Sequence, residues 1–136
     1  MIITEKNVNE SHFDEIVALV HNEDGLITLN KDEVKCILSG KEGTMYQADQ
    51  ETGVESGVFM KRFFSALKRK NVAHECTSML ISIAIPPEIP LMMEDVELVH
   101  DFIESVTNEN VEIKWGIKNS EHGNQMSILT ICTREK

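Results

Sequence analysis

The sequence lacks several features that mark particular protein classes. It has only 3 proline and 7 glycine residues in 136, and it contains no repeat or low-complexity segment, which excludes collagen-like and proline-rich chains. No apolar run reaches the ~18 residues of a transmembrane helix, and no apolar signal-peptide core follows the first methionine. The three cysteines, Cys36, Cys76 and Cys132, lie far apart. Without a secretion signal, we expect reduced, buried thiols in a cytoplasmic protein.

Positive charge is also scarce. The chain has 13 Lys and Arg against 23 Asp and Glu, which gives a formal net charge of −10. Non-specific DNA or RNA binding needs a cationic surface, so we expect no nucleic-acid partner and, without an apolar span, no membrane partner. A chain of this length fits one domain. We expect residues 1–10 to be frayed and residues 11–136 to form that domain.

The motifs of common active sites are missing. Neither GxGxxG nor GxxxxGK[ST] occurs, and there is no GxSxG nucleophile motif. Glu97 and His100 have the i, i+3 spacing of half a di-iron site, but the sequence has no second such pair. We therefore expect no metal, no cofactor and no catalytic residue.

What the sequence does contain is an alternation of helical and strand patterns. The apolar spacing predicts an element order of α-α-β-α-β-α-β-β, with the last two strands forming a hairpin. This order predicts an α/β fold with a mixed sheet and helices packed on it. The predicted helices begin at Ser11, Asn30, Val54 and Met93, and the predicted strands are 43–48, 78–85, 111–117 and 126–133.

Local signals mark the ends of some helices. Ser11 and Asn30 are good N-caps, and Gly25 and Gly40 stand where the first two helices should end. The third helix carries a basic group, which is either a solvated face or a face for an acidic partner. Its members are Lys61, Arg62, Lys68 and Arg69, followed by Lys70.

Three predicted strands and one loop carry a family resemblance. Asn110–Ile117 is similar to the strand pattern N-I-I-F-G, Ser127–Thr133 to R-V-T-V-I-A-T, and Ser78–Ile83 to G-V-L-V-N-I. Five residues match the loop string I-T-x-P-G-L-I-N-V-D-F-A-D-V-K, namely Gly25, Leu26, Ile27, Val34 and Lys35. In this order, from about Phe13 to Thr133, the chain resembles the C-terminal domain of FtsZ, the bacterial tubulin homologue of cell division.

The resemblance implies a two-layer sandwich, with a four-stranded mixed sheet and helices on one face. In FtsZ the matched loop is the catalytic insert, which reaches the nucleotide of the next filament subunit. The family's Asn falls on Thr28, its first Asp on Asn30 and its second Asp on Glu33. One carboxylate is therefore lost, and the family's GTP-binding half is not in this sequence. The resemblance thus implies a protein that is not a GTPase.

Two functional hypotheses follow. The first is a non-catalytic, bacterial, stand-alone FtsZ C-terminal-like domain that binds or regulates tubulin- or FtsZ-like filaments, or itself, through an interaction loop of Thr28, Asn30 and Glu33. The second is a homo-oligomeric ligand-binding or enzymatic domain with a pocket between subunits. Its polar candidates are Glu97, His100 and Arg62. A fragment of a longer chain is a third alternative.

Overall fold

The chain folds around one mixed sheet of five strands. The computed structural model describes residues 1–21, 27–89, 92–106, 111–120 and 124–136. The strands lie in the order β1-β2-β5-β3-β4, and only β3 and β4 run parallel. Their bounds are Thr4–Asn9 (β1), Lys41–Asp49 (β2), Ser78–Ile85 (β3), Glu112–Asn119 (β4) and Ser127–Glu135 (β5). The predicted α/β fold with a mixed sheet is confirmed, with five strands where four were expected.

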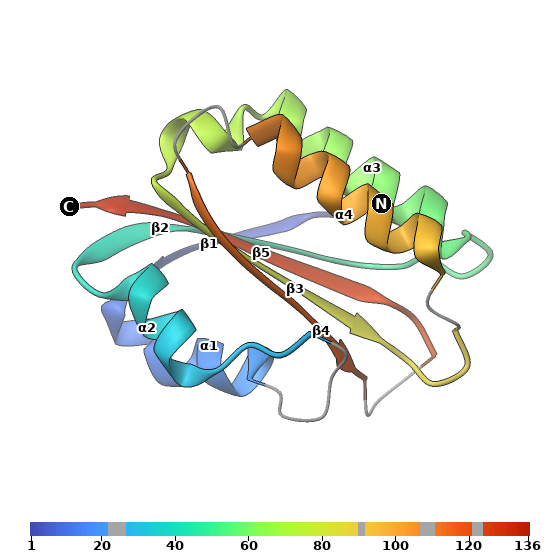
Figure 1. The fold of residues 1–136 in the computed structure, drawn as a ribbon, viewed down its shortest axis with the longest axis horizontal. Helices are drawn as coiled ribbons and strands as arrows, with labels where there is room; N and C mark the ends of the chain where they lie inside the picture. The colour runs from blue at the N-terminus through green and yellow to red at the C-terminus, as the bar shows by residue number, and fades with distance from the viewer. Residues whose placement is uncertain (22–26, 90–91, 107–110, 121–123) are drawn as a thin grey trace.

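Helices cover both faces of the sheet (Figure 1). One face carries α1 (Phe13–Val20) and α2 (Lys31–Leu38), and the other carries α3 (Ser56–Arg69) and α4 (Met93–Val106). Two 3-10 turns, η1 (Glu10–His12) and η2 (Val72–Glu75), precede α1 and follow α3. The structure therefore has three layers, and the expectation of two layers with helices on one face was wrong.

The reason lies in β3, whose eight residues are all buried. Successive side chains of a strand point to opposite faces. Leu80 packs with α1 and α2, whereas Met79 and Ile81 pack with α3 and α4. A strand that is apolar on both faces needs a helical layer on each side to keep it from water.

The first residues form a strand, contrary to the expectation that residues 1–10 are frayed. β1 pairs antiparallel with β2 along its whole length, and Val8 is buried against α1 and α2. Its polar side chains lie at the rim of the sheet, where Lys6 pairs with Glu15 and Glu5 pairs with Lys70. An edge strand rich in charge resists pairing with other chains, so the polar sequence is compatible with a strand.

The predicted hairpin between the last two strands does not form. β3 lies between β4 and β5, parallel to the first and antiparallel to the second. A strand buried on both faces is most stable with a hydrogen-bonded neighbour on each edge, and β4 and β5 supply these neighbours. Short spacing along the chain did not decide the pairing.

Two of the four local signals, Asn30 and Gly40, gave the right helix ends. Asn30 is the N-cap of α2, and Gly40 follows that helix with a φ of +69°, in the left-handed region. The cap of the first helical segment is Asn9 rather than Ser11, since the Asn9 side chain accepts a hydrogen bond from the Ser11 amide. Gly25 lies outside the described residues.

Cys76 and Cys132 are buried as expected, whereas Cys36 is exposed.

Candidate functional site

The candidate interaction loop begins on the outer edge of β4. Ile27 forms an antiparallel bridge with Ile117, in which the Ile117 amide donates to the Ile27 carbonyl at 2.8 Å. Two residues on, the Leu29 side chain is fully buried against α1 and α2. The backbone bridge and the Leu29 side chain thus hold the segment 27–33 against the sheet.

Gly116 makes this close approach feasible. A Cβ at this position would lie 2.7 Å from Leu29 Cγ and 2.8 Å from the Ile27 carbonyl oxygen. Both distances are far below van der Waals contact, so only a residue without a side chain fits here. A glycine inside a strand often marks a position where another backbone segment approaches closely. In this sequence Gly116, directly after Trp115, is such a glycine.

Asn30 and Glu33 form a capping box at the start of α2. The Glu33 amide donates to Asn30 Oδ1 at 2.9 Å, and the Asn30 amide donates to Glu33 Oε1 at 3.2 Å. Both groups therefore satisfy backbone amides that have no partner inside the helix. The Asn-x-x-Glu spacing is a sequence signal for this box. Asn30 was predicted as the N-cap from the sequence, but the part played by Glu33 was not predicted.

The structure places the three loop residues on one short stretch. Thr28 and Asn30 are exposed on either side of buried Leu29, and Glu33 is half-buried. Asn30 carries an amide, which cannot act as a base, and the carboxylate of Glu33 is bound to the helix N-terminus. The segment therefore presents a polar contact surface rather than a pair of free carboxylates. Gly25 and Leu26, which carried part of the resemblance, lie outside the described residues.

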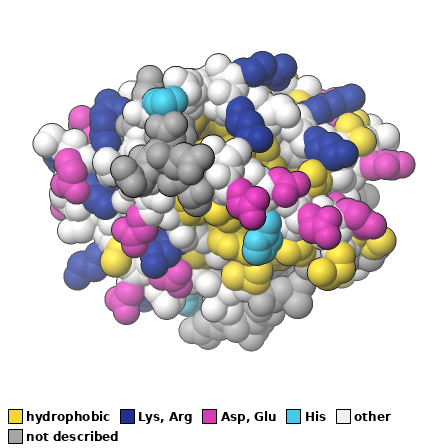
Figure 2. Space-filling view, turned by 45° about the horizontal axis from the view of Figure 1, so that its top comes forward, with side chains coloured by type: hydrophobic (Ala, Val, Ile, Leu, Met, Phe, Trp, Pro, Cys, Tyr) yellow, Lys and Arg dark blue, Asp and Glu magenta, His cyan; other side chains and the backbone are white. Residues whose placement is uncertain are grey.

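The predicted basic residues of α3 all lie at the surface. Lys61, Arg62, Lys68 and Arg69 are exposed, and Figure 2 shows Lys and Arg gathered beside a band of Asp and Glu on this side of the molecule. Lys70 is instead tied to β1, because its ammonium group lies 2.9 Å from Glu5 Oε1. The basic face sits across the sheet from the loop 28–33, so these two candidate surfaces are separate.

The residues of the oligomer hypothesis lie on α3 and α4. His100 packs edge-on against Trp115 of β4, with 5.5 Å between the ring centroids, while Glu97 is exposed on the same helix. Neither of two grooves on the described surface is lined by Glu97, His100 or Arg62. Within the described ranges, no group of three His, Cys, Asp or Glu side chains could hold a metal ion.

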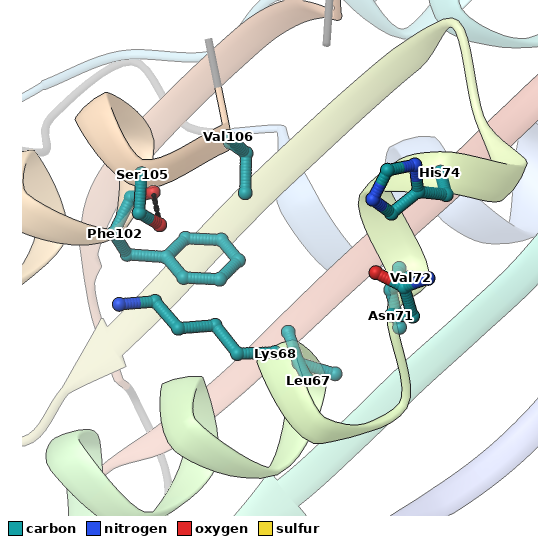
Figure 3. A pocket seen from close by; sticks show the side chains of 8 residues that line it. All are labelled: Leu67, Lys68, Asn71, Val72, His74, Phe102, Ser105 and Val106. Atoms are coloured by element: carbon teal, nitrogen blue, oxygen red, sulfur yellow. Dashed lines mark hydrogen bonds between the residues drawn. The ribbon is translucent and has the colours of Figure 1, made fainter. Parts of the chain in front are cut away.

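One of these grooves lies where α3 and α4 end (Figure 3). Its floor is apolar, from Leu67, Val72, Phe102 and Val106. Its polar lining residues are Lys68, Asn71, His74 and Ser105, and Figure 3 shows the Lys68 side chain extending from α3 toward α4. Sequence patterns did not predict this groove, because it forms only where two helices distant in sequence meet.

The other groove lies where α3 and α4 begin. Its lining includes Ser56 and Gly57 from α3 and Glu94 and Asp95 from α4. Asp95 is 4% exposed, and its carboxylate accepts a hydrogen bond from the Met92 amide at 3.3 Å. The buried acid therefore serves the start of its own helix.

Comparison with known proteins supports the fold. No protein-family model matches the sequence, and no curated protein sequence matches it. A solved FtsZ dimer from M. jannaschii matches 82% of this chain at 18% identity and a TM-score of 0.56, and a point mutant of that FtsZ matches 90% at 19% and 0.60. Thiamine monophosphate kinase from Aquifex aeolicus matches 90% at 17% identity, with a TM-score of only 0.42.

The matches cover 32% and 39% of the two FtsZ chains and 41% of the kinase, so this chain spans about two fifths of their length or less. At this identity the similarity concerns the fold. No described helix is both long and apolar enough to cross a lipid bilayer. The similarity to the two FtsZ structures shows that the chain has an FtsZ-like α/β fold.

Proposed function

We propose that this chain is a non-catalytic protein-interaction module, equivalent to the C-terminal domain of FtsZ, that binds or regulates FtsZ- or tubulin-like filaments in cell division. The observation that carries the proposal is the loop 28–33, anchored at the edge of an FtsZ-like fold with its polar side chains exposed. In this proposal Thr28 and Asn30 contact the filament subunit, and Glu33 holds the loop in place. The carboxylate chemistry of the FtsZ insert is absent, since Asn30 replaces an acid and Glu33 caps α2.

Co-sedimentation tests this proposal. The purified chain is mixed with FtsZ from the same source and centrifuged with GTP, which assembles filaments, and without it. We expect the chain to enter the pellet with the filaments, or to change the amount of FtsZ that pellets, only when GTP is present. If the chain stays in the supernatant and the polymer mass is unchanged, the proposed function is wrong.

A matched pair of variants tests the loop itself. Thr28→Arg places a bulky cation on the proposed contact surface without touching the capping box. Thr52→Arg makes the same change at an exposed turn before α3, distant in sequence from the loop. We expect the first variant to weaken filament binding about tenfold or more and the second to bind like the parent chain. Equal binding by both variants would remove the loop from the interface.

A further inference from the structure

The outer surfaces of α3 and α4 carry charges of opposite sign. Two cations of α3, Lys61 and Lys68, stand two turns apart, with Arg62 and Arg69 beside them. The exposed acids of α4 include Glu94, Glu97 and Asp101, at the i, i+3 and i+7 spacing of one helix face. We call the four cations the basic stripe and the three acids the acidic stripe. Figure 2 shows the two kinds of charge as neighbouring groups on one face of the molecule.

The two stripes run in the same direction and in a defined register. One groove is lined by the first residues of both helices and the other by the last, so α3 and α4 are parallel. A Cβ on Gly57 would lie 3.6 Å from Asp95, and the rings of Phe64 and Phe102 stack with centroids 4.6 Å apart. In both pairs the residue of α4 lies 38 positions after its neighbour of α3 in the sequence (95 − 57 and 102 − 64). By the same offset, Lys61 lies at the level of position 99 along the helix axes, between Glu97 and Asp101.

These charges do not neutralise one another within the chain. Among the described residues, no ion pair within 4 Å joins Lys61 or Lys68 to Glu97 or Asp101. The residues of both stripes are exposed, whereas the inner faces of the two helices are occupied by aromatic and aliphatic packing. The charges of these two lysines and two acids therefore remain available to a partner.

We propose that the partner of this surface is a second copy of the chain. The two copies are related by a two-fold axis that runs parallel to α3 and α4, outside the molecule and midway between the two helices. This axis places α3 of each copy on α4 of the other. The helices then run parallel, and each basic stripe meets an acidic stripe at the level where Lys61 lies between Glu97 and Asp101. A self-complementary patch of this kind is what a two-fold dimer requires.

A purely acidic partner fits this surface less well than a second copy. Such a partner would be attracted by the basic stripe but repelled by the acidic stripe beside it.

The remaining charges of two copies repel each other, since each chain carries a net charge of −10. At physiological salt, however, charges farther apart than about 8 Å are screened more than charges in contact. We therefore expect a weak dimer that persists at physiological salt and dissociates at high salt.

Charge reversal tests the pairing directly. The first variant, Lys61→Glu with Lys68→Glu, replaces two of the four cations of the basic stripe with acids. The second, Glu97→Lys with Asp101→Lys, replaces two of the three acids of the acidic stripe with cations. Each alone should self-associate more weakly than the parent chain, but an equimolar mixture should form a heterodimer, because the acids introduced in one variant then meet the cations introduced in the other. The control, Lys35→Glu with Lys136→Glu, makes the same change in net charge as the first variant, at exposed positions outside α3, α4 and the loop 28–33.

Sedimentation equilibrium gives the mass of each sample in about 150 mM salt. The parent chain and the control should rise from the 15.4 kDa monomer toward twice that mass with increasing concentration. Each reversed variant should associate at least about tenfold more weakly, and their mixture should recover the dimer. A parent chain that stays monomeric up to about 1 mM would overturn the proposal. So would a control that loses the dimer equally, or a mixture that does not associate. Filament binding through the loop 28–33 is independent of each outcome.

Discussion

Replacing Thr130 with valine should stabilise the protein. Thr130 lies in β5 between Tyr46 of β2 and Ile81 of β3, and its side chain is fully buried. Its hydroxyl oxygen has no hydrogen-bond partner among the described residues. Valine has nearly the same shape as threonine and suits a β-strand, so the substitution removes the hydroxyl without opening a cavity.

The size of the effect follows from the cost of an unsatisfied polar group. Burying a donor or acceptor without a partner costs ~1–3 kcal/mol, part of which the folded state recovers when the group is removed. We expect the free energy of unfolding to rise by about 1 kcal/mol for Thr130→Val. For a domain of this size, that corresponds to an increase in melting temperature of about 4 °C.

A second threonine of the same strand provides the matched control. Thr133 is also fully buried, but its hydroxyl donates to the Ile37 carbonyl at 2.6 Å. Ile37 lies in the last turn of α2, where carbonyls lack partners inside the helix. Thr133→Val should therefore lower the free energy of unfolding by ~1–2 kcal/mol.

Urea unfolding, followed by circular dichroism, measures both variants. The reasoning predicts opposite signs for the same chemical change at two equally buried positions. If Thr130→Val destabilises the protein as much as Thr133→Val does, the Thr130 hydroxyl has a partner in solution and the reasoning is refuted. Unchanged denaturant slopes would show that both variants unfold from the same native state.

Three further predictions concern the loop, the strand that supports it and one surface carboxylate. Asn30→Ala should lower the free energy of unfolding by about 1 kcal/mol in thermal or urea unfolding, whereas Asn30→Asp, which keeps the cap, should change it little. Gly116→Ala should cost about 2 kcal/mol and shift backbone NMR signals of the loop, because its Cβ would overlap the segment 27–29, whereas Gly57→Ala, with room for its methyl group inside a helix, should be neutral or stabilising. A hydrogen bond from Lys6 holds the pKa of Glu15 below its ordinary value of 4.5, so an NMR titration should show that pKa rise in Lys6→Met.

Each of these predictions has an outcome that contradicts it. Equal loss from Asn30→Ala and Asn30→Asp would mean that the cap does not stabilise α2. A harmless Gly116→Ala would mean that the segment 27–29 is not packed against β4. A carboxylate with a lowered pKa in the folded state stabilises that state above its ordinary pKa, and this contribution disappears as the pH falls through the lowered value. An unchanged Glu15 titration in Lys6→Met would show that the ion pair does not form in solution.

Local patterns predicted the central elements because those patterns depend on near neighbours in sequence. The bounds of β3 and of α4 were predicted correctly, since one is an apolar run, interrupted at Ser82 and ended by prolines, and the other has an apolar stripe with helical spacing. Asn30 was correctly predicted as an N-cap, since capping involves residues within one turn. The bounds of α3 were predicted within two residues for the same reason.

The candidate site was only partly accessible to sequence reasoning. The resemblance to FtsZ pointed to Thr28, Asn30 and Glu33, but the mutual capping of the last two became clear from the hydrogen bonds. The contacts that hold the loop, Leu29 in the core and Gly116 beneath it, join segments more than eighty residues apart in sequence. Whether the loop binds a filament stays a prediction.

The sequence by itself determined the alternation of helices and strands, the fully buried character of β3 and the separate charges of α3 and α4. Tertiary structure alone decided that the polar first residues form an edge strand, that β3 separates β4 from β5, and that helices cover both faces. The physical reason is that these choices depend on pairing and burial between distant segments. Local preference selects an element, but hydrogen bonding along both edges of β3 and exclusion of water from both its faces select its neighbours.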